Sequence, residues 1–271
     1  MKKRITITLD SNLLNKIDNL ALNLQGENRS SVIEKFLSEY LKSNIKTAVV
    51  LAGDPKLKKN QPIKALTSIN NKPAIYYILK KLSNAGIQEV YICIDKNTAE
   101  LKDKVKAKEF PDLKLKFVLE HKSLNTGGAI KQLKNKLIFP FLVYYADILT
   151  NLDLNKLLSF HINYKPLATV VVSPSTKPNL FGQITLEGIN LEHFYGKQSQ
   201  QKSVIVNTGI YVLDPEIFKY FPVEDKFELD AVLKKLIPSK KIIGYITNSS
   251  WIDLGTSEKI KDNLKNLVLE D

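Results

Sequence analysis

Arginine, the side chain that can hold a phosphate or a guanine base through two parallel hydrogen bonds, is confined to the start of the sequence. Of the 40 basic residues only Arg4 and Arg29 are arginines, and every later fixed cation is a lysine. Lysine binds phosphate as a point charge, without the planar two-point geometry of a guanidinium. Two-point recognition of a phosphate or a guanine base by a guanidinium is therefore available only to the first thirty residues.

The elements expected around these two arginines are one strand and two helices. Residues 4–9 alternate between polar and apolar side chains, as a strand with one apolar face does. Asp10 can cap a first helix, and a capping box from Ser31 to Glu34 predicts a second. A lone strand leaves both edges unpaired, and so short a segment cannot bury its own apolar faces. The pattern therefore predicts a dimer in which two such strands pair antiparallel.

In its order of elements, the segment 2–43 resembles a ribbon-helix-helix DNA-binding domain. The resemblance implies an intertwined homodimer or higher homo-oligomer whose two-stranded ribbon enters the major groove of double-stranded operator DNA. The residues that it assigns to base edges are Arg4, Thr6 and Thr8, and those that it assigns to a phosphate are Arg29, Ser30 and Ser31. The alternative is a dimerisation module with no role on DNA.

Composition sets the broad class of the chain. With 44% apolar and 25% charged residues it is globular, and its longest apolar run, Ile138–Ala146, is too short to cross a bilayer. The single cysteine, Cys93, excludes an internal disulfide, and we expect a cytoplasmic protein with no membrane partner. The net charge of +12 is compatible with a polyanionic partner, but taken by itself it favours the ordinary alternative, a lysine-rich solvated surface.

The chain divides at a short linker, Lys42–Lys46, so we expect one domain over 1–44 and a second over 47–271. In the second domain apolar runs alternate with helical patterns, which is typical of an α/β fold with a doubly wound, mostly parallel sheet. The expected strands are 48–51, 89–94, 115–119, 141–145, 168–172, 205–213 and 242–246, and the expected helices are 73–85, 99–106, 128–133, 154–163 and 257–267. In such sheets ligands bind at the carboxyl ends of the strands.

Seven segments in the second domain together resemble the sugar-1-phosphate nucleotidyltransferases, the NDP-sugar pyrophosphorylases with a glycosyltransferase-A-like fold. These segments are Val49–Gly53, Pro62–Leu66, Asn71–Leu79, Leu124–Ala129, Tyr145–Asp147, Val206–Tyr211 and Trp251–Gly255. The family joins an NTP to a sugar 1-phosphate and releases pyrophosphate. The resemblance covers residues 47–267 and implies the same fold there.

The resemblance also implies site residues. Asp147 and Asp253 match the pair that holds the catalytic Mg²⁺, and two carboxylates with phosphate oxygens suit that ion. Lys64 matches the lysine on the nucleotide phosphates. The positions matched to nucleotide and sugar binding are Leu51, Ala52, Gly53, Gly127, Gly128, Lys197 and Asn207. The ordinary alternatives are turn or cap aspartates, a surface lysine, and glycines at the start of a helix.

The loop after the first strand departs from the family pattern. The family has L-x-G-G-x-G-T-R, whereas this chain has Asp54-Pro55 after Gly53 and lacks the arginine, so fewer N–H groups face a triphosphate. This departure predicts weak or absent catalysis. Combined with the first domain, it favours a transcriptional regulator that binds a nucleotide, sugar phosphate or sugar nucleotide as effector. The competing hypothesis is an active Mg²⁺-dependent nucleotidyltransferase with an accessory DNA-binding head.

Overall fold

The structure, a computed structural model, describes residues 5–23, 28–42, 45–58, 60–196, 203–255 and 267–268. The chain divides into two compact units, Met1–Asn44 and Ile45–Asp271. No helix in the described part of the chain is both long and apolar enough to cross a membrane.

The first unit contains two helices, α1 (Ser11–Asn23) and α2 (Arg29–Lys42). The Asp10 carboxylate caps α1 by accepting the Leu13 N–H at 2.9 Å. The expected capping box at Ser31 is replaced by an earlier cap, because α2 begins at Arg29 and the side chain of Asn28 accepts the Ser31 N–H at 2.9 Å. The expected strand over 4–9 is not formed: residues 5–10 have no regular secondary structure, as a lone strand without a pairing partner would not.

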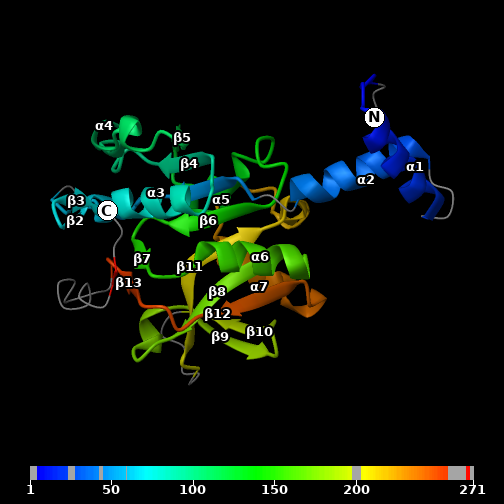
Figure 1. Cartoon of the computed structure of the whole chain (residues 1–271). Coiled ribbons are helices and arrows are strands. Elements are labelled where there is room, and N and C mark those ends of the chain that lie inside the picture. Colours follow the sequence, from blue (N-terminus) through cyan, green and yellow to red (C-terminus); the bar gives the residue numbers. More distant parts are fainter. Residues whose placement is uncertain are drawn as a thin grey trace. The chain divides into compact units, whose positions relative to one another are not determined.

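The second unit is built on one nine-stranded sheet in the order β5-β4-β1-β6-β11-β8-β12-β10-β9, with two small additional sheets, β13-β7 and β2-β3 (Figure 1). The strands are β1 Thr47–Leu51, β2 Ser68–Ile69, β3 Lys72–Pro73, β4 Glu89–Ile94, β5 Lys114–Leu119, β6 Phe141–Tyr145, β7 Ile148–Thr150, β8 Ala168–Pro174, β9 Gln183–Glu187, β10 Asn190–Tyr195, β11 Ile205–Leu213, β12 Ile242–Ile246 and β13 Trp251–Asp253.

The sheet is less parallel than the sequence predicts. The half β5-β4-β1-β6 is parallel throughout, but β11 runs antiparallel to both β6 and β8. Parallel neighbours need a crossover connection, usually a helix. Between β8 and β11 the described chain instead forms the β9–β10 hairpin, which turns at Gly188 with φ +60°. The expectation of a mostly parallel sheet is therefore correct for one half and wrong for the other.

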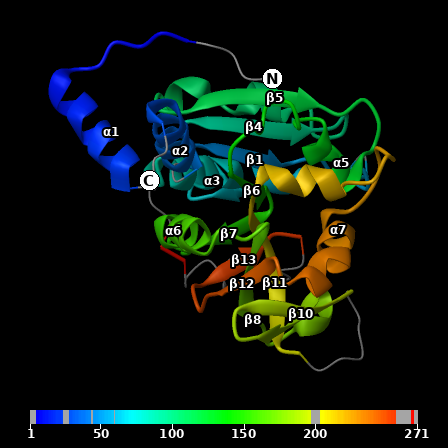
Figure 2. The ribbon, with the colours of Figure 1, turned by 90° about the vertical axis from the view of Figure 1, so that its right-hand side faces the viewer.

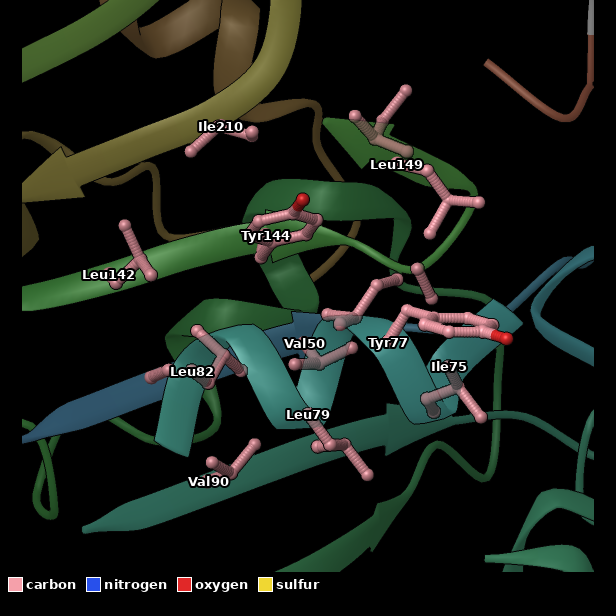
Figure 3. Close-up of a cluster of buried hydrophobic side chains, with 14 of the residues drawn as sticks. Val50, Ile75, Tyr77, Leu79, Leu82, Val90, Leu142, Tyr144, Leu149 and Ile210 are labelled. Carbon is pink, nitrogen blue, oxygen red and sulfur yellow. The ribbon is translucent and has the colours of Figure 1, made fainter. Parts of the chain in front are cut away.

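Helices cover both faces of the sheet, as Figure 2 shows. One face packs against α3 (Ala74–Asn84), α4 (Leu101–Lys104) and α6 (Leu154–Tyr164), and the other against α5 (Asn125–Lys131) and α7 (Leu229–Leu236). In Figure 3 Ile75, Leu79 and Leu82 of α3 lie against the side chains of β1, β4 and β6. The helix expected over 257–267 falls almost wholly outside the described residues.

Candidate active site

The candidate site lies at the carboxyl ends of β1 and β6, which are adjacent because these two strands pair in parallel. The Ala52 N–H bonds Cys93 O at 2.9 Å and the Ala146 N–H bonds Leu51 O at 3.0 Å, so pairing continues until the strands end. Gly53 and Asp147 then follow these last paired residues. Leu51 and Ala52 therefore position the site through the backbone, at the edge where ligands of open α/β sheets bind.

The two aspartates matched to the metal site are brought together by the small β7–β13 sheet. Asp253 is paired with Ile148, which directly follows Asp147, and the Leu254 N–H bonds the Asp147 carbonyl at 2.8 Å. Residues more than a hundred positions apart in the sequence thus become neighbours through backbone pairing. This fixed backbone holds both carboxyl groups at the same end of β6.

Lys64 lies between acidic side chains at this edge. Its Nζ is 3.5 Å from Asp147 Oδ2 and 3.6 Å from Asp54 Oδ2. A Cβ atom added to Gly255 would lie 2.9 Å from Lys64 Nζ and 3.0 Å from Asp253 Oδ1, so the absence of a side chain at Gly255 leaves room for both groups. The three residues that the sequence assigns to catalysis are therefore gathered around one point.

The electrostatics of the cluster follow from its excess of carboxylates. Burial alone would lower the pKa of Lys64, but Asp147, Asp54 and Asp253 raise it above its ordinary value, which keeps the ammonium charged. Burial and the neighbouring Asp253 raise the pKa of Asp147, and Lys64 offsets only part of that effect. A further cation at this point would therefore stabilise the ionised aspartates.

The donor set fits Mg²⁺ provided that a phosphate completes the coordination. Mg²⁺ is commonly held by one or two carboxylates together with substrate phosphate oxygens and water. Asp147 and Asp253 supply two carboxylates, and the described residues contain no ready cage of three or more His, Cys, Asp or Glu side chains. The geometry suits an ion that arrives with a phosphorylated ligand.

Two further carboxyl groups beside Gly53 were not predicted from the sequence. A Cβ atom added to Gly53 would lie 3.5 Å from Glu120 Oε1 and 3.6 Å from Asp95 Oδ2. Asp95 directly follows β4 and Glu120 directly follows β5, so the rule that ligands bind at strand ends could have found both. Asp95 Oδ2 is the buried side-chain oxygen that lacks a hydrogen-bond partner among the residues described.

The two glycines assigned to nucleotide binding pack against the chain itself. The N–H groups of Gly127 and Gly128 both donate to Phe227 O, at 2.9 and 3.3 Å. A Cβ atom added to Gly127 would lie 2.3 Å from the Phe227 ring, and one added to Gly128 would lie 2.0 Å from Asp225 O. Their small size therefore admits the segment before α7. The first residue of α5, Asn125, has φ +58° at the same corner.

The structure describes only one of the two residues, Asn207 and Lys197, that the sequence matched to sugar binding. The backbone N–H of Asn207 bonds Gly182 O at 2.9 Å, and its side-chain oxygen accepts the N–H of Gly209, which has φ +81°. Its amide nitrogen donates to Tyr211 Oη and to Asp230. Asn207 thus holds an irregularity in β11 through contacts within the chain. Lys197 lies outside the described residues.

Of the residues assigned to DNA, Arg4 also lies outside the described part, and Thr6 and Thr8 are exposed on the irregular segment. The Arg29 guanidinium takes both carboxylate oxygens of Asp18, with Nη2 2.7 Å from Oδ2. Ser30 and Ser31 lie in the first turn of α2. Arg29 therefore joins α2 to α1, and its guanidinium is already occupied.

Comparisons with known proteins concern the second unit. A family model described as nucleotidyl transferase matches residues 55–268. The chain is 27% identical over 195 residues to a D-glycero-alpha-D-manno-heptose 1-phosphate guanylyltransferase of Campylobacter jejuni, covering 72% of this chain and 86% of that protein. The protein of the same name from Aneurinibacillus thermoaerophilus is 26% identical over 206 residues, covering 75% and 89%.

A solved structure agrees on the fold. HddC from Yersinia pseudotuberculosis, complexed with GMP-PN, superposes with a TM-score of 0.66 at 23% identity, covering 82% of this chain and 98% of that one. The prediction of a transcriptional regulator with a ligand-sensing second domain is wrong, because these two relatives, which match 72% and 75% of this chain, are named as sugar-1-phosphate guanylyltransferases. The observation behind that prediction was the altered loop after β1, with Asp54-Pro55 and no arginine, and in the structure Lys64 still lies 3.5 Å from Asp147 beside this loop.

Proposed function

The chain belongs to the nucleotidyl transferase family, and from this premise we propose that it transfers a nucleoside monophosphate from an NTP to a sugar 1-phosphate. The observation that carries the proposal is the convergence of Lys64, Asp147 and Asp253 at the carboxyl edge of the sheet. The products are an NDP-sugar and pyrophosphate. The hypothesis of an active Mg²⁺-dependent enzyme, which the sequence left as the alternative, is thereby preferred.

In the proposed reaction a phosphate oxygen of the sugar 1-phosphate attacks the α-phosphorus of the NTP. The bond from that phosphorus to the bridging oxygen of the β-phosphate breaks, and pyrophosphate leaves with the bonding electron pair. Asp147 and Asp253 would hold Mg²⁺, which when bound offsets the charge on the phosphate oxygens. The charged ammonium of Lys64 would bind a phosphate oxygen directly, so its task is positioning and charge neutralisation.

We propose guanine as the base, on the chemistry of the carboxyl groups beside Gly53. Burial raises the pKa of Glu120, and Asp95 contributes to the same shift, so a ligand that donates hydrogen bonds would stabilise the ionised form. Guanine presents adjacent N1–H and N2–H₂ donors to a single carboxylate. Uracil and thymine offer a single N3–H donor flanked by two carbonyl oxygens, which the second oxygen of a carboxylate would repel. The relatives named as guanylyltransferases agree with this choice.

The test is pyrophosphate release by the full chain with Mg²⁺. Each of GTP, UTP, dTTP, ATP and CTP is paired with mannose 1-phosphate, glucose 1-phosphate or a heptose 1-phosphate. We expect turnover with GTP that is lost in Asp147→Asn, and a shift toward UTP and dTTP in Glu120→Gln, whose amide can both donate and accept. Absence of pyrophosphate with every pair would contradict the function, and an unchanged base preference in Glu120→Gln would contradict the assignment of guanine alone.

For the first unit we propose self-association, consistent with its resemblance to a ribbon-helix-helix domain. The exposed fractions of Ile5, Ile7, Leu22 and Leu37 are 77, 49, 75 and 55%, which leaves apolar surface on the irregular segment and on both helices. A second copy of this chain could cover these side chains and pair the segment 5–10. We expect a dimer in analytical ultracentrifugation that Ile7→Lys dissociates. Val223→Lys, at a residue 94% exposed on the second unit, is the matched control.

A further inference from the structure

Asp54 places a carboxylate among the groups that would bind a phosphate. It follows Gly53 at the carboxyl end of β1, and its Oδ2 lies 3.6 Å from Lys64 Nζ. Its Oδ1 accepts the backbone N–H of Lys56 at 3.2 Å. An ammonium and a loop N–H are the two kinds of donor that hold phosphate oxygens in nucleotide sites. In the free protein the Asp54 carboxylate contacts both of these donors, the Lys64 ammonium and the Lys56 N–H.

The backbone around Asp54 is fixed, so its side chain cannot leave by a simple movement of the loop. The Asp54 carbonyl accepts the Leu57 N–H at 3.1 Å and the side-chain amide of Asn97, also at 3.1 Å. The second bond joins the loop after β1 to the turn after β4. With a side chain 27% exposed, the carboxylate nevertheless remains within reach of a ligand. Asp54 is therefore held at the edge of the site.

The carboxylates around Lys64 also compete with a bound phosphate for its positive charge. Asp54, Asp147 and Asp253 all act on the single ammonium of Lys64. If Asp147 and Asp253 held Mg²⁺, the ion would offset their charge, and Asp54 would be the carboxylate left to compete with the ligand for Lys64. Repulsion between Asp54 and a bound phosphate chain grows with the charge on that chain.

We infer that Asp54 is a specificity-determining residue that discriminates between nucleotides by their phosphate charge, an inference that rests on the proposed function. It weakens the binding of the triphosphate substrate more than that of the sugar-diphosphate product, whose phosphates carry less charge. Removing the carboxylate charge should therefore tighten NTP binding most. Two unit charges about 4 Å apart interact by an amount that corresponds to about fivefold in affinity in water and to far more near a protein surface, so for this partly exposed carboxylate we expect a change of at least about tenfold.

The test compares the full chain with Asp54→Asn, which retains the oxygen that accepts the Lys56 N–H. Dissociation constants for GTP and for GDP-mannose are measured by isothermal titration calorimetry without Mg²⁺, so that no turnover occurs. We expect Asp54→Asn to bind GTP about tenfold more tightly and GDP-mannose about threefold more tightly. The matched control is Asp112→Asn, which removes an exposed carboxylate. Asp112 precedes the amino end of β5, whereas the candidate site lies at the carboxyl ends of the strands.

The outcomes separate the two proposals. Equal affinities in wild type and Asp54→Asn, or weaker binding in the variant, would overturn the role of Asp54 even if the wild type releases pyrophosphate. Equal gains for both nucleotides would show that Asp54 does not discriminate by charge, and would likewise overturn it. If neither form binds any nucleotide with or without Mg²⁺, the proposed function fails and this inference fails with it.

Discussion

The packing of Gly127 against Phe227 gives a quantitative prediction. In Gly127→Ala the new methyl group would lie 2.3 and 2.4 Å from two ring carbons and 3.0 Å from the Phe227 carbonyl oxygen. Inserting a methyl group into a packed contact costs about 1–3 kcal/mol of unfolding free energy. For a chain of this size that corresponds to a fall in Tm of roughly 2–12 °C. A Cβ atom on Gly196 meets nothing within 4 Å, so Gly196→Ala is the matched control.

The assay is thermal and urea unfolding of wild type, both single variants and the double variant Gly127→Ala/Phe227→Ala. The double variant should lose less stability than the sum of its two single changes, because removing the ring makes room for the methyl group. A wild-type Tm in Gly127→Ala together with a raised KM for the nucleotide would refute the reasoning. That result would show that the glycine faces ligand instead of Phe227.

Three further predictions concern single groups. Replacement of Asp253 by Asn should lower pyrophosphate release at least about 100-fold while the Tm remains near that of wild type, since a metal ligand contributes several kcal/mol of charge stabilisation; near-normal turnover would contradict the metal assignment. Burial lowers the pKa of His161 to about 4, so the contribution of this residue to the free energy of unfolding should be complete above pH 6.5 and fall by about 3 kcal/mol toward pH 4. Urea titrations should show that this component of the pH dependence is absent in His161→Gln. Burial raises the pKa of the Cys93 thiol, and a thiol reagent such as DTNB should react with it only after unfolding, whereas reaction in the native state would contradict its buried placement.

The strands best predicted from the sequence are those with continuous apolar runs. Strands β4, β6, β11 and β12 begin and end at the expected residues, because apolar residues predominate in each and all four lie in the sheet interior. The β9–β10 hairpin was missed, since polar and apolar residues are mixed there and one strand lies at the sheet edge. Its absence from the expected elements is also why the sheet was expected to be mostly parallel.

The site was predicted in part, for a related reason. Lys64, Asp147 and Asp253 could be named because short motifs surround them, although their meeting depends on the β7–β13 pairing. Gly127 belongs to a glycine pair at the start of a helix. From the sequence alone, such a pair is as compatible with close approach of a ligand as with close packing of another segment of the chain. The deciding neighbour, Phe227, is a hundred residues away and has no motif that identifies it. Sequence patterns locate residue types, whereas the contact that uses them is set by the tertiary fold.

The lysines of β5 restrict how copies of this protein can assemble. β5 is an edge of the nine-stranded sheet, with unpaired backbone groups on its outer side, and it carries Lys114 and Lys116. A second sheet approaching this edge would bring like charges together, a common protection against edge-to-edge aggregation. The Lys116 ammonium forms an ion pair with Glu89 on the neighbouring strand β4 and lies over the Tyr91 ring of that strand, so the exposed Lys114 provides most of this protection. The second unit is thus protected from growing into a larger sheet through β5, and association between chains is directed to other surfaces.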